Sequence, residues 1–364
     1  MIRRPTTIVI GAGSSCELGL PSGAELRRLI AKSLEPDYSN AWRFREERLQ
    51  RALRGMLGVN GHLNQDRMFA LADAAHKIQV GMSVAASIDN YLHTHQDDAD
   101  INMLGKYGIA ANILLAERES LLFEKSHRPP FNHVNRLDTL QGNDFQRISW
   151  FPDLARWLFT GVDKKYPERA FKDLRFVVFN YDRCLEQFLW LAVQAYFDIA
   201  SAEAAFLIGN LDVVHPYGSV GNLPWQLAST ENGSVEFGED EPEKLFRVAA
   251  NIKTFTESVA ADVDEKVRQY IAASHVTLFM GYGFAEQNND LLRPPNRGQS
   301  ARAFATAFGL SDADRHMIYD AIGDITMAGA GAWNDLSRNG IPVFLESGTC
   351  RDLMQHHSLQ LSLR

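Results

Sequence analysis

The stretch from Thr6 to Gly23, TTIVIGAGSSCELGLPSG, decides which class of fold the sequence predicts. It opens with the apolar run Ile8–Ile10, which is typical of a buried strand, and turns through Gly11 and Gly13. A second bend follows at Gly19–Pro21, and apolar residues then recur at the spacing of one helix face: Leu26, Leu29, Ile30 and Leu34. A strand, a glycine turn and a helix start are how an α/β domain brings backbone N–H groups to a phosphate. The turn alone does not establish a phosphate site, because glycine is common wherever a strand meets a helix.

The composition is that of an ordinary globular protein, and it excludes several classes. The chain has 364 residues, enough for one large domain or two, of which 45% are hydrophobic and 23% charged. Its net charge of −8 argues against broad electrostatic binding to nucleic acid. Cys16, Cys184 and Cys350 are far apart, which excludes the common zinc modules and a disulfide framework. No apolar run reaches the roughly 20 residues of a membrane span and the N-terminus lacks a signal-peptide pattern, so we expect a cytoplasmic protein.

The rest of the chain divides into a long helical segment and a series of strands. Helical patterns dominate residues 24–171, apart from a loop predicted at Ser126–Gln146. Apolar runs typical of strands follow at Leu174–Phe179, Leu211–Val214, Val276–Met280, Ala303–Phe308 and Ile341–Leu345. This order predicts an α/β fold with a doubly wound, mostly parallel sheet and a large helical insertion. We expect residues 1–23 and 172–364 to form the sheet domain and residues 24–171 a helical subdomain, since about 150 residues far exceed what a crossover needs.

Polar residues follow several of the predicted strands at the point where each strand ends. Besides the glycine turn, these segments are Asn180-Tyr181-Asp182, His215-Pro216-Tyr217-Gly218-Ser219 and Gly281-Tyr282-Gly283-Phe284, with Asp290 beyond. Because the carboxyl ends of parallel strands share one edge of a sheet, we expect these segments to line one crevice. Glycines let the backbone approach phosphates, while Asn, Asp and His supply directed polar groups.

Taken together and in this order, GAGSS, GLPSG, FNYD, the His-Gly loop and GYGF resemble the sirtuin-like NAD-binding fold. The chain looks closest to the bacterial sirtuin-like proteins of antiviral defence, which hydrolyse NAD. The motifs run from Ile8 to about Asp290, and the helical insertion has no counterpart. The resemblance implies a sirtuin-like Rossmann sheet, NAD as the substrate, no metal, and cleavage of NAD to nicotinamide and ADP-ribose. It implies contacts with NAD at Gly11, Ala12, Gly13, Ser14, Pro21, Tyr217, Gly218, Gly281, Gly283 and Asp290.

Three polar residues are the candidates for catalysis of such a reaction. The bond between ribose and nicotinamide breaks through an oxocarbenium-like transition state, and nicotinamide leaves as a neutral group, so no strong acid is needed. Asn180 can fix a hydroxyl group or a water, because its amide both donates and accepts hydrogen bonds. His215 can take the proton, and Asp182 can hold Asn180 or bond the ribose. Structural alternatives stay open, since Asn180 and Asp182 are also favoured helix caps and His215 can be an ordinary turn residue.

The sequence also departs from the sirtuin deacylases. It cannot supply their four-cysteine zinc module, and Ser22-Gly23-Ala24 stands where they carry Asp-Phe-Arg, which favours a hydrolase over a protein deacylase. The family commonly places a histidine directly before glycine, whereas here Tyr217 precedes Gly218 and His215 lies two residues earlier. Either His215 reaches the ribose from a shifted register or Tyr217 takes its place.

The resemblance implies a biological role in abortive antiviral defence through depletion of NAD. Such an enzyme must be silent in a healthy cell, so we expect control by assembly into a homo-oligomer or by a partner. Relatives of similar build pair with a HerA-type ATPase, a prokaryotic Argonaute or copies of themselves, and the helical insertion and residues 311–364 are the candidate interfaces. Two alternatives remain. One is an NAD-dependent protein deacylase or ADP-ribosyltransferase, and the other is a sensor that binds NAD or ADP-ribose without turnover, which the shifted histidine favours.

Overall fold

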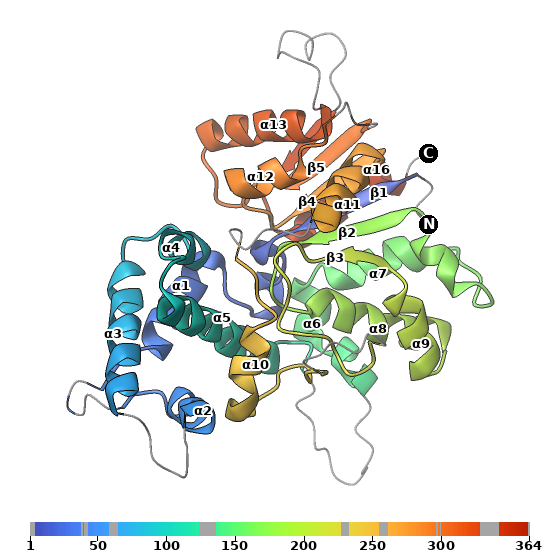
Figure 1. Ribbon diagram of the computed structural model, residues 1–364. Coiled ribbons are helices and arrows are strands. Elements are labelled where there is room, and N and C mark those ends of the chain that lie inside the picture. The colour runs from blue at the N-terminus through green and yellow to red at the C-terminus, as the bar shows by residue number, and fades with distance from the viewer. Residues whose placement is uncertain are drawn as a thin grey trace.

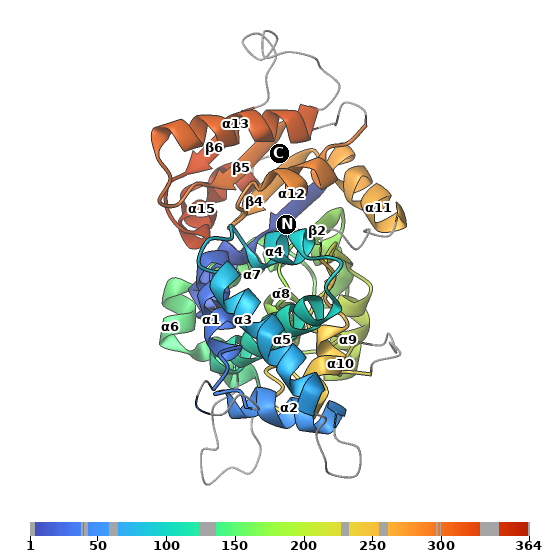
Figure 2. The same cartoon turned by 60° about the vertical axis from the view of Figure 1, so that its left-hand side comes forward.

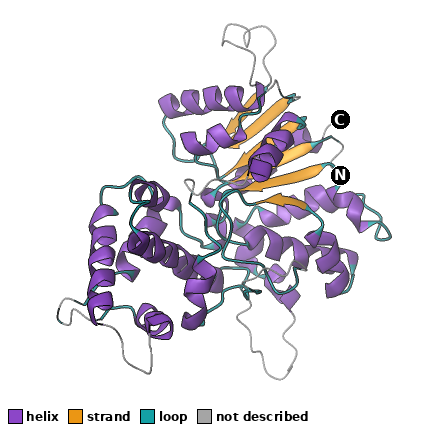
Figure 3. Cartoon of the chain, viewed as in Figure 1, coloured by secondary structure: helices purple, strands orange, loops and turns teal. Residues whose placement is uncertain are grey.

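The computed structural model describes residues 4–37, 39, 43–57, 65–123, 136–226, 233–254, 261–295, 298, 300–327 and 342–362. At its centre is one sheet of six parallel strands in the order β3-β2-β1-β4-β5-β6. The strands are β1 (Thr6–Ile10), β2 (Leu174–Val178), β3 (Asp212–Val214), β4 (Val276–Met280), β5 (Arg302–Thr306) and β6 (Val343–Glu346). This is the order of the doubly wound dinucleotide-binding fold, and it reverses between β1 and β4. The predicted α/β fold is therefore confirmed (Figures 1 and 3).

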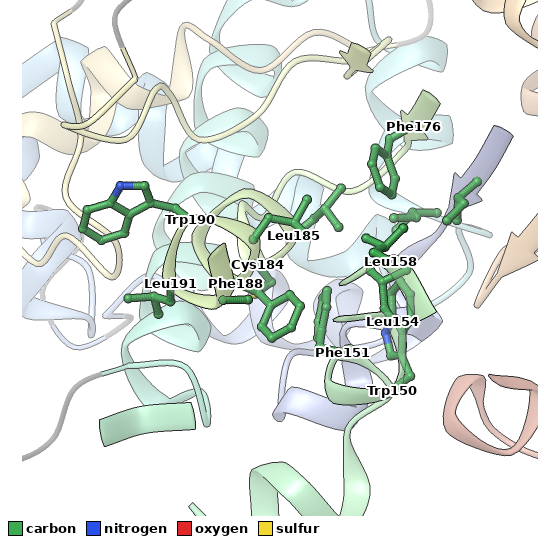
Figure 4. Close-up of a cluster of buried hydrophobic side chains, with 14 of the residues drawn as sticks. Trp150, Phe151, Leu154, Leu158, Phe176, Cys184, Leu185, Phe188, Trp190 and Leu191 are labelled. Carbon is green, nitrogen blue, oxygen red and sulfur yellow. The ribbon is translucent and has the colours of Figure 1, made fainter. Parts of the chain in front are cut away.

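Both faces of the sheet are covered by helices, as the side-chain alternation along β1 requires. Ile8 and Ile10 point into one hydrophobic cluster and Val9 points into another, because successive side chains of a strand face opposite sides. The first cluster contains side chains of α7 (Phe151–Phe159), α8 (Cys184–Phe197) and α15 (Cys350–His356). Figure 4 shows part of it, with Phe176 of β2 at one end and Trp190 of α8 at the other. The second cluster contains side chains of α11 (Ala261–Ala272), α12 (Glu286–Leu292) and α13 (Asp312–Met327).

A third hydrophobic cluster lies outside the sheet and is built mainly from helices. Its long central element is α5 (Ala99–Glu119), which contacts α1 (Gly23–Ser33), α3 (Gln65–Gly81), α4 (Ile88–Thr94) and α10 (Leu245–Ala249). The short helix α2 (Glu47–Leu57) packs against α10. We call this group of helices the helical cluster. It lies beside the carboxyl edge of the sheet in both views (Figures 1 and 2).

The packing groups the helices differently from the predicted domain boundaries. Helix α7 falls inside residues 24–171, yet it packs against the sheet, whereas α10 lies far beyond residue 171 and packs against α5. The reason is that α10 presents its buried side chains, Leu245, Val248 and Ala249, to a core that the sheet does not share. The boundaries 1–23 with 172–364 and 24–171 stay a prediction.

Local secondary structure departs from the prediction in several places. The predicted loop at Ser126–Gln146 contains a 3-10 helix (Arg136–Gln141) and α6 (Asn143–Ile148), while residues 126–135 lie outside the described residues. The pattern did not predict α9 (Ser201–Gly209), α10, α12, α13, α15 or α16 (Ser358–Ser362). Most of these helices are short, and α13 carries many charged residues with little apolar periodicity. Such segments are stabilised by tertiary packing, which a local pattern does not record.

A fully buried ion pair joins the helical cluster to the sheet domain. Arg183, at the start of α8, donates from Nη2 to Oε2 of Glu117 on α5 at 2.6 Å and from Nε to Oε1 at 3.1 Å. The two side chains are only 2% and 0% exposed. Arg183 also donates to the backbone oxygens of Val235 and Glu236, and the Gly238 N–H donates to Glu117. Both charges are thus paired and hydrogen-bonded, which burial of an ion pair demands.

Candidate functional site

Four strand ends meet at the carboxyl edge of the sheet, as the sequence predicts. The turn after β1 contacts the end of β4, since the Gly13 N–H donates to the Gly281 oxygen at 3.0 Å. It contacts the end of β2 through Ser15, and the segment after β3 reaches β2 through His215. The edge faces the helical cluster (Figure 1). The contact between the β1 turn and the end of β4 lies where the strand order reverses, which is where open α/β sheets bind ligands.

The glycines of this edge bring two backbone segments into direct contact. A Cβ atom on Gly11 would lie 2.5 Å from the Gly281 oxygen, and one on Gly281 would lie 2.0 Å from the Ser14 nitrogen. Gly281 also has a φ of +57°, in the left-handed region that favours glycine. Backbone packing therefore explains Gly11, Gly13 and Gly281 without a ligand. Ala12 and Gly13 are exposed on the turn, and their contact with NAD stays a prediction.

Gly281→Ala is expected to lower the free energy of unfolding by about 2 kcal/mol or more, because a left-handed conformation and a backbone clash act together. Gly283 is the matched control two residues later. Its φ is not in the left-handed region and a Cβ there meets nothing within 4 Å, so Gly283→Ala should change stability by less than about 0.5 kcal/mol. Urea denaturation of both variants checks this. Equal losses would show that the contact between the two turns does not hold the edge together.

A chain of hydrogen bonds fixes the orientation of the Asn180 amide. The hydroxyl of Ser15 donates to Oδ1 of Asp182 at 3.2 Å, and the Cys184 N–H donates to the same oxygen at 3.1 Å. Because the Ser15 proton is used in this way, Ser15 Oγ accepts from Nδ2 of Asn180, at 3.1 Å. Asp182 thus accepts from the first N–H of α8 and, through Ser15, also orients Asn180. Burial raises the pKa of its carboxyl group. Sequence reasoning allowed both roles but did not single out Ser15.

The other end of the Asn180 amide carries a buried acceptor that no described residue satisfies. Asn180 is only 6% exposed, and its Oδ1 atom has no hydrogen-bond partner in the described part of the chain. Leaving such a group unpaired costs about 1–3 kcal/mol, so buried polar atoms without partners are uncommon. They occur where a ligand or a water supplies the missing donor. A hydroxyl group would satisfy Oδ1.

His215 has partners on both ring nitrogens. Nδ1 lies 3.1 Å from the backbone oxygen of Asn180, and Nε2 lies 2.6 Å from Oε1 of Glu186 on α8. A backbone oxygen only accepts, so Nδ1 carries a hydrogen, and the carboxylate favours a second hydrogen on Nε2. Burial alone would lower the pKa of His215, but the charge and hydrogen bond of Glu186 outweigh burial and raise it. His215 therefore holds the Asn180 backbone through Nδ1 and pairs with Glu186 through Nε2.

This pair gives a testable dependence of stability on pH. The pKa of His215 is higher in the folded protein than in the unfolded one, so protonated His215 stabilises the fold at pH values below the unfolded pKa. That contribution is lost as the pH rises through the folded pKa. Burial alone would raise the pKa of Glu186, but the charge of His215 lowers it. The contribution of Glu186 to stability is therefore lost as the pH falls through this lowered pKa. We expect the free energy of unfolding to fall as the pH rises above about 6.5. Glu186→Gln should remove most of this slope and lower stability at neutral pH by about 3 kcal/mol.

Urea denaturation between roughly pH 5 and pH 9 measures the slope. Glu203→Gln makes the same change at an exposed position on the adjacent helix α9, and it should leave both slope and stability unchanged. A slope retained in Glu186→Gln would mean that another group titrates in this range.

The remaining predicted residues divide between the edge and the outer surface. Tyr217 is buried and donates its hydroxyl to Oδ1 of Asn288 on α12 at 2.8 Å, and burial raises its pKa to about 12. Gly218 has a φ of +72°, and a Cβ there would lie 2.2 Å from the Asn251 oxygen. Asp290 is exposed on α12 and pairs with Arg293. The structure thus brings Tyr217 to the edge and leaves Asp290 on the surface of its helix.

Several residues that sequence reasoning did not select help to build the edge. The indole N–H of Trp150 donates to the Ser14 oxygen at 3.0 Å, and Glu17 accepts from the Trp150 and Arg351 N–H groups. Burial raises the pKa of Glu17 to about 7. In the second bend Leu20 and Pro21 are buried, whereas Gly19 is exposed. Glu17 lies in the quoted stretch, but no local signal connects it to a helix more than a hundred residues away.

The helical cluster also contacts the end of β2. Tyr181, between Asn180 and Asp182, donates its hydroxyl to the carboxylate of Asp89 in the first turn of α4. Burial raises the pKa of Asp89. This contact fixes α4 against the segment that carries Asn180.

Comparisons of the chain with protein-family models, with curated proteins and with solved structures found no match. None of the helices that the structure describes has the length and apolar character that crossing a membrane requires. Within the described ranges, no group of three or more His, Cys, Asp or Glu side chains is arranged to hold a metal ion. What the site does must be inferred from its geometry.

Proposed function

We propose that the chain hydrolyses NAD to nicotinamide and ADP-ribose at the carboxyl edge of the sheet. The observation that carries the proposal is the buried, unsatisfied Oδ1 atom of Asn180, which follows β2 and is hydrogen-bonded to the turn after β1, beside the reversal of strand order between β1 and β4. NAD suits this position, because an exposed glycine turn lies beside it and a ribose hydroxyl can supply the missing donor.

In this proposal the residues position the reactants and do little proton transfer. Asn180 accepts a hydrogen bond from a ribose hydroxyl or from the attacking water, and Ser15 and Asp182 keep its amide in the required orientation. The water oxygen bonds to the ribose carbon as the bond to nicotinamide breaks, and the bonding electrons leave with the neutral nicotinamide. The proton of the water passes to solvent.

His215 takes a positioning role here, in place of the predicted general base. Both of its nitrogens face acceptors, so neither has a lone pair free for the proton of a water. Its hydrogen bond to the Asn180 backbone fixes the segment that carries the reacting amide. A conservative His215→Gln variant, which can still donate to that backbone oxygen, should retain more activity than His215→Ala.

The same observation about His215 favours a second candidate, a module that binds NAD or ADP-ribose without turning it over. One experiment separates the two. Purified protein is incubated with NAD, with and without its genomic neighbour, nicotinamide release is followed, and NAD binding is measured in parallel by calorimetry. Release supports the hydrolase, binding without release supports the sensor, and absence of both contradicts an NAD site at this edge.

The biological setting of the proposal follows from the resemblance of the motifs. We propose that the enzyme depletes NAD in antiviral defence and is activated by self-assembly or by a partner such as a HerA-type ATPase or an Argonaute. Addition of the genomic neighbour to the nicotinamide assay tests activation, with an increase in rate as the expected result.

A further inference from the structure

A cavity lies apart from the carboxyl edge and shares no lining residue with the candidate NAD site. Its volume is about 750 Å³, within the 300–1,000 Å³ range of small-molecule sites. It lies between the C-terminal end of α5, one side of α8, and the segments around residues 223–225 and 236–241. The sequence EFGEDE at 236–241 has no role in the proposed NAD site.

Apolar and aromatic side chains form much of the cavity wall. Trp190 and Trp225 stack with an interplanar angle of 6° and a centroid distance of 5.5 Å, and Trp225 is only partly buried. The Trp225 indole N–H donates to Oε1 of Gln187 at 3.3 Å, which fixes the plane of the ring. The other apolar lining residues are Leu122, Phe123, Leu191, Leu223, Pro224 and Phe237. A rigid, flat aromatic wall favours a flat ligand that stacks on it.

The charges around the cavity select the sign of that ligand. Four carboxylates line it, Glu236, Glu239, Asp240 and Glu241, against a single lining cation, Arg118. Arg118 is paired with Asp240, as is Arg48, while Lys244 pairs with both Glu239 and Glu241. Glu236 has no ion-pair partner among the described residues, so one carboxylate remains in surplus at the wall. A cation over an aromatic face is attracted by the ring, and the surplus carboxylate adds to that attraction.

We propose that this cavity binds a planar aromatic cation of small-molecule size. Its acidic wall disfavours the phosphates of NAD, so the cavity is a site separate from the proposed hydrolase. If the cavity does not bind such a cation, the proposal of NAD hydrolysis is unaffected. Trp225 supplies the stacking face and Glu236 the counter-charge.

Two tricyclic dyes of matched size and opposite charge test the proposal on the full chain. Proflavine is the cationic probe and anthracene-9-carboxylate the anionic one, and fluorescence polarisation of each reports binding. We expect saturable binding of proflavine, at least about tenfold tighter than that of the anion. Trp225→Leu should weaken proflavine binding about tenfold, and Glu236→Gln about threefold.

Glu265→Gln is the matched control, because Glu265 is an exposed carboxylate on α11 on the opposite face of the sheet. It should leave the proflavine affinity unchanged. Glu236 is itself exposed, so Glu236→Gln keeps the test valid if Trp225→Leu does not fold. The proposal is overturned if neither dye binds, if the anion binds as tightly as the cation, or if folded cavity variants bind proflavine like the unmodified chain.

Discussion

Asn180→Ala should lower the rate of nicotinamide release from NAD by at least about a hundredfold, because in the proposed hydrolysis it removes the atom that orients the reacting hydroxyl or water. The side chain is 6% exposed, its Nδ2 donates to Ser15, and its Oδ1 has no hydrogen-bond partner among the described residues. Truncation to alanine deletes both groups and leaves the backbone bond to His215 in place. The measurement is the steady-state rate of nicotinamide release, with NAD affinity determined by calorimetry on the same sample.

The control for this variant is Asn210→Ala, which truncates an exposed asparagine at the end of α9 and should leave the rate unchanged. Circular dichroism verifies that both variants fold. Full activity of a folded Asn180→Ala protein would remove Asn180 from the mechanism and with it the observation on which the proposed function rests. Lost release with retained NAD affinity would assign the residue to the chemical step.

The class of fold could be predicted from the sequence because buried parallel strands are short apolar runs with little ambiguity. Val276–Met280 is a strand over the full predicted range, and β2 differs from its prediction by one residue. The order of the strands was not predicted, because right-handed crossovers fix the face on which each connection lies and not which strands pair. Helices were predicted less completely: α5 lies in the segment predicted to be helical, whereas α13, which is rich in charged residues and has little apolar periodicity, was not predicted.

The position of the candidate site was predictable for a simpler reason, since parallel strands end at the same edge. The pairings within it were not. Nothing in the local sequence joins His215 to Glu186 or Trp150 to Ser14, because these contacts depend on how α8 and α7 dock on the sheet. The histidine illustrates the consequence: its residue type suggested a base, whereas both of its ring nitrogens face acceptors and the Glu186 carboxylate raises its pKa.

The helical cluster shows the limit of reading domains from chain order. Its core takes side chains from residues 26–114 and again from α10, and it includes Tyr181 and Tyr217 of the candidate site. Those two tyrosines follow strands in sequence, yet they pack against helices. A boundary drawn along the chain therefore cannot separate the helical cluster from the site, and substitutions in α4 or α5 should affect both.

Glu117→Gln tests that connection and should lower the free energy of unfolding by about 3–5 kcal/mol, because it leaves the Arg183 guanidinium buried without its counter-charge. The exposed pair of Arg147 and Asp144 is the matched control: Asp144→Asn breaks a contact of 3.2 Å between side chains that are mostly exposed, and should cost less than about 0.5 kcal/mol. Urea denaturation of both variants gives the comparison, and a loss below about 1 kcal/mol in Glu117→Gln would show that the pair is not buried as described.

Arg183 directly follows Asp182, which orients Asn180 through Ser15. Weakening the contact between Arg183 and α5 should therefore also disturb the Asn180 amide. If the proposed hydrolysis is correct, folded Glu117→Gln protein should therefore release nicotinamide more slowly, although Glu117 lies outside the site.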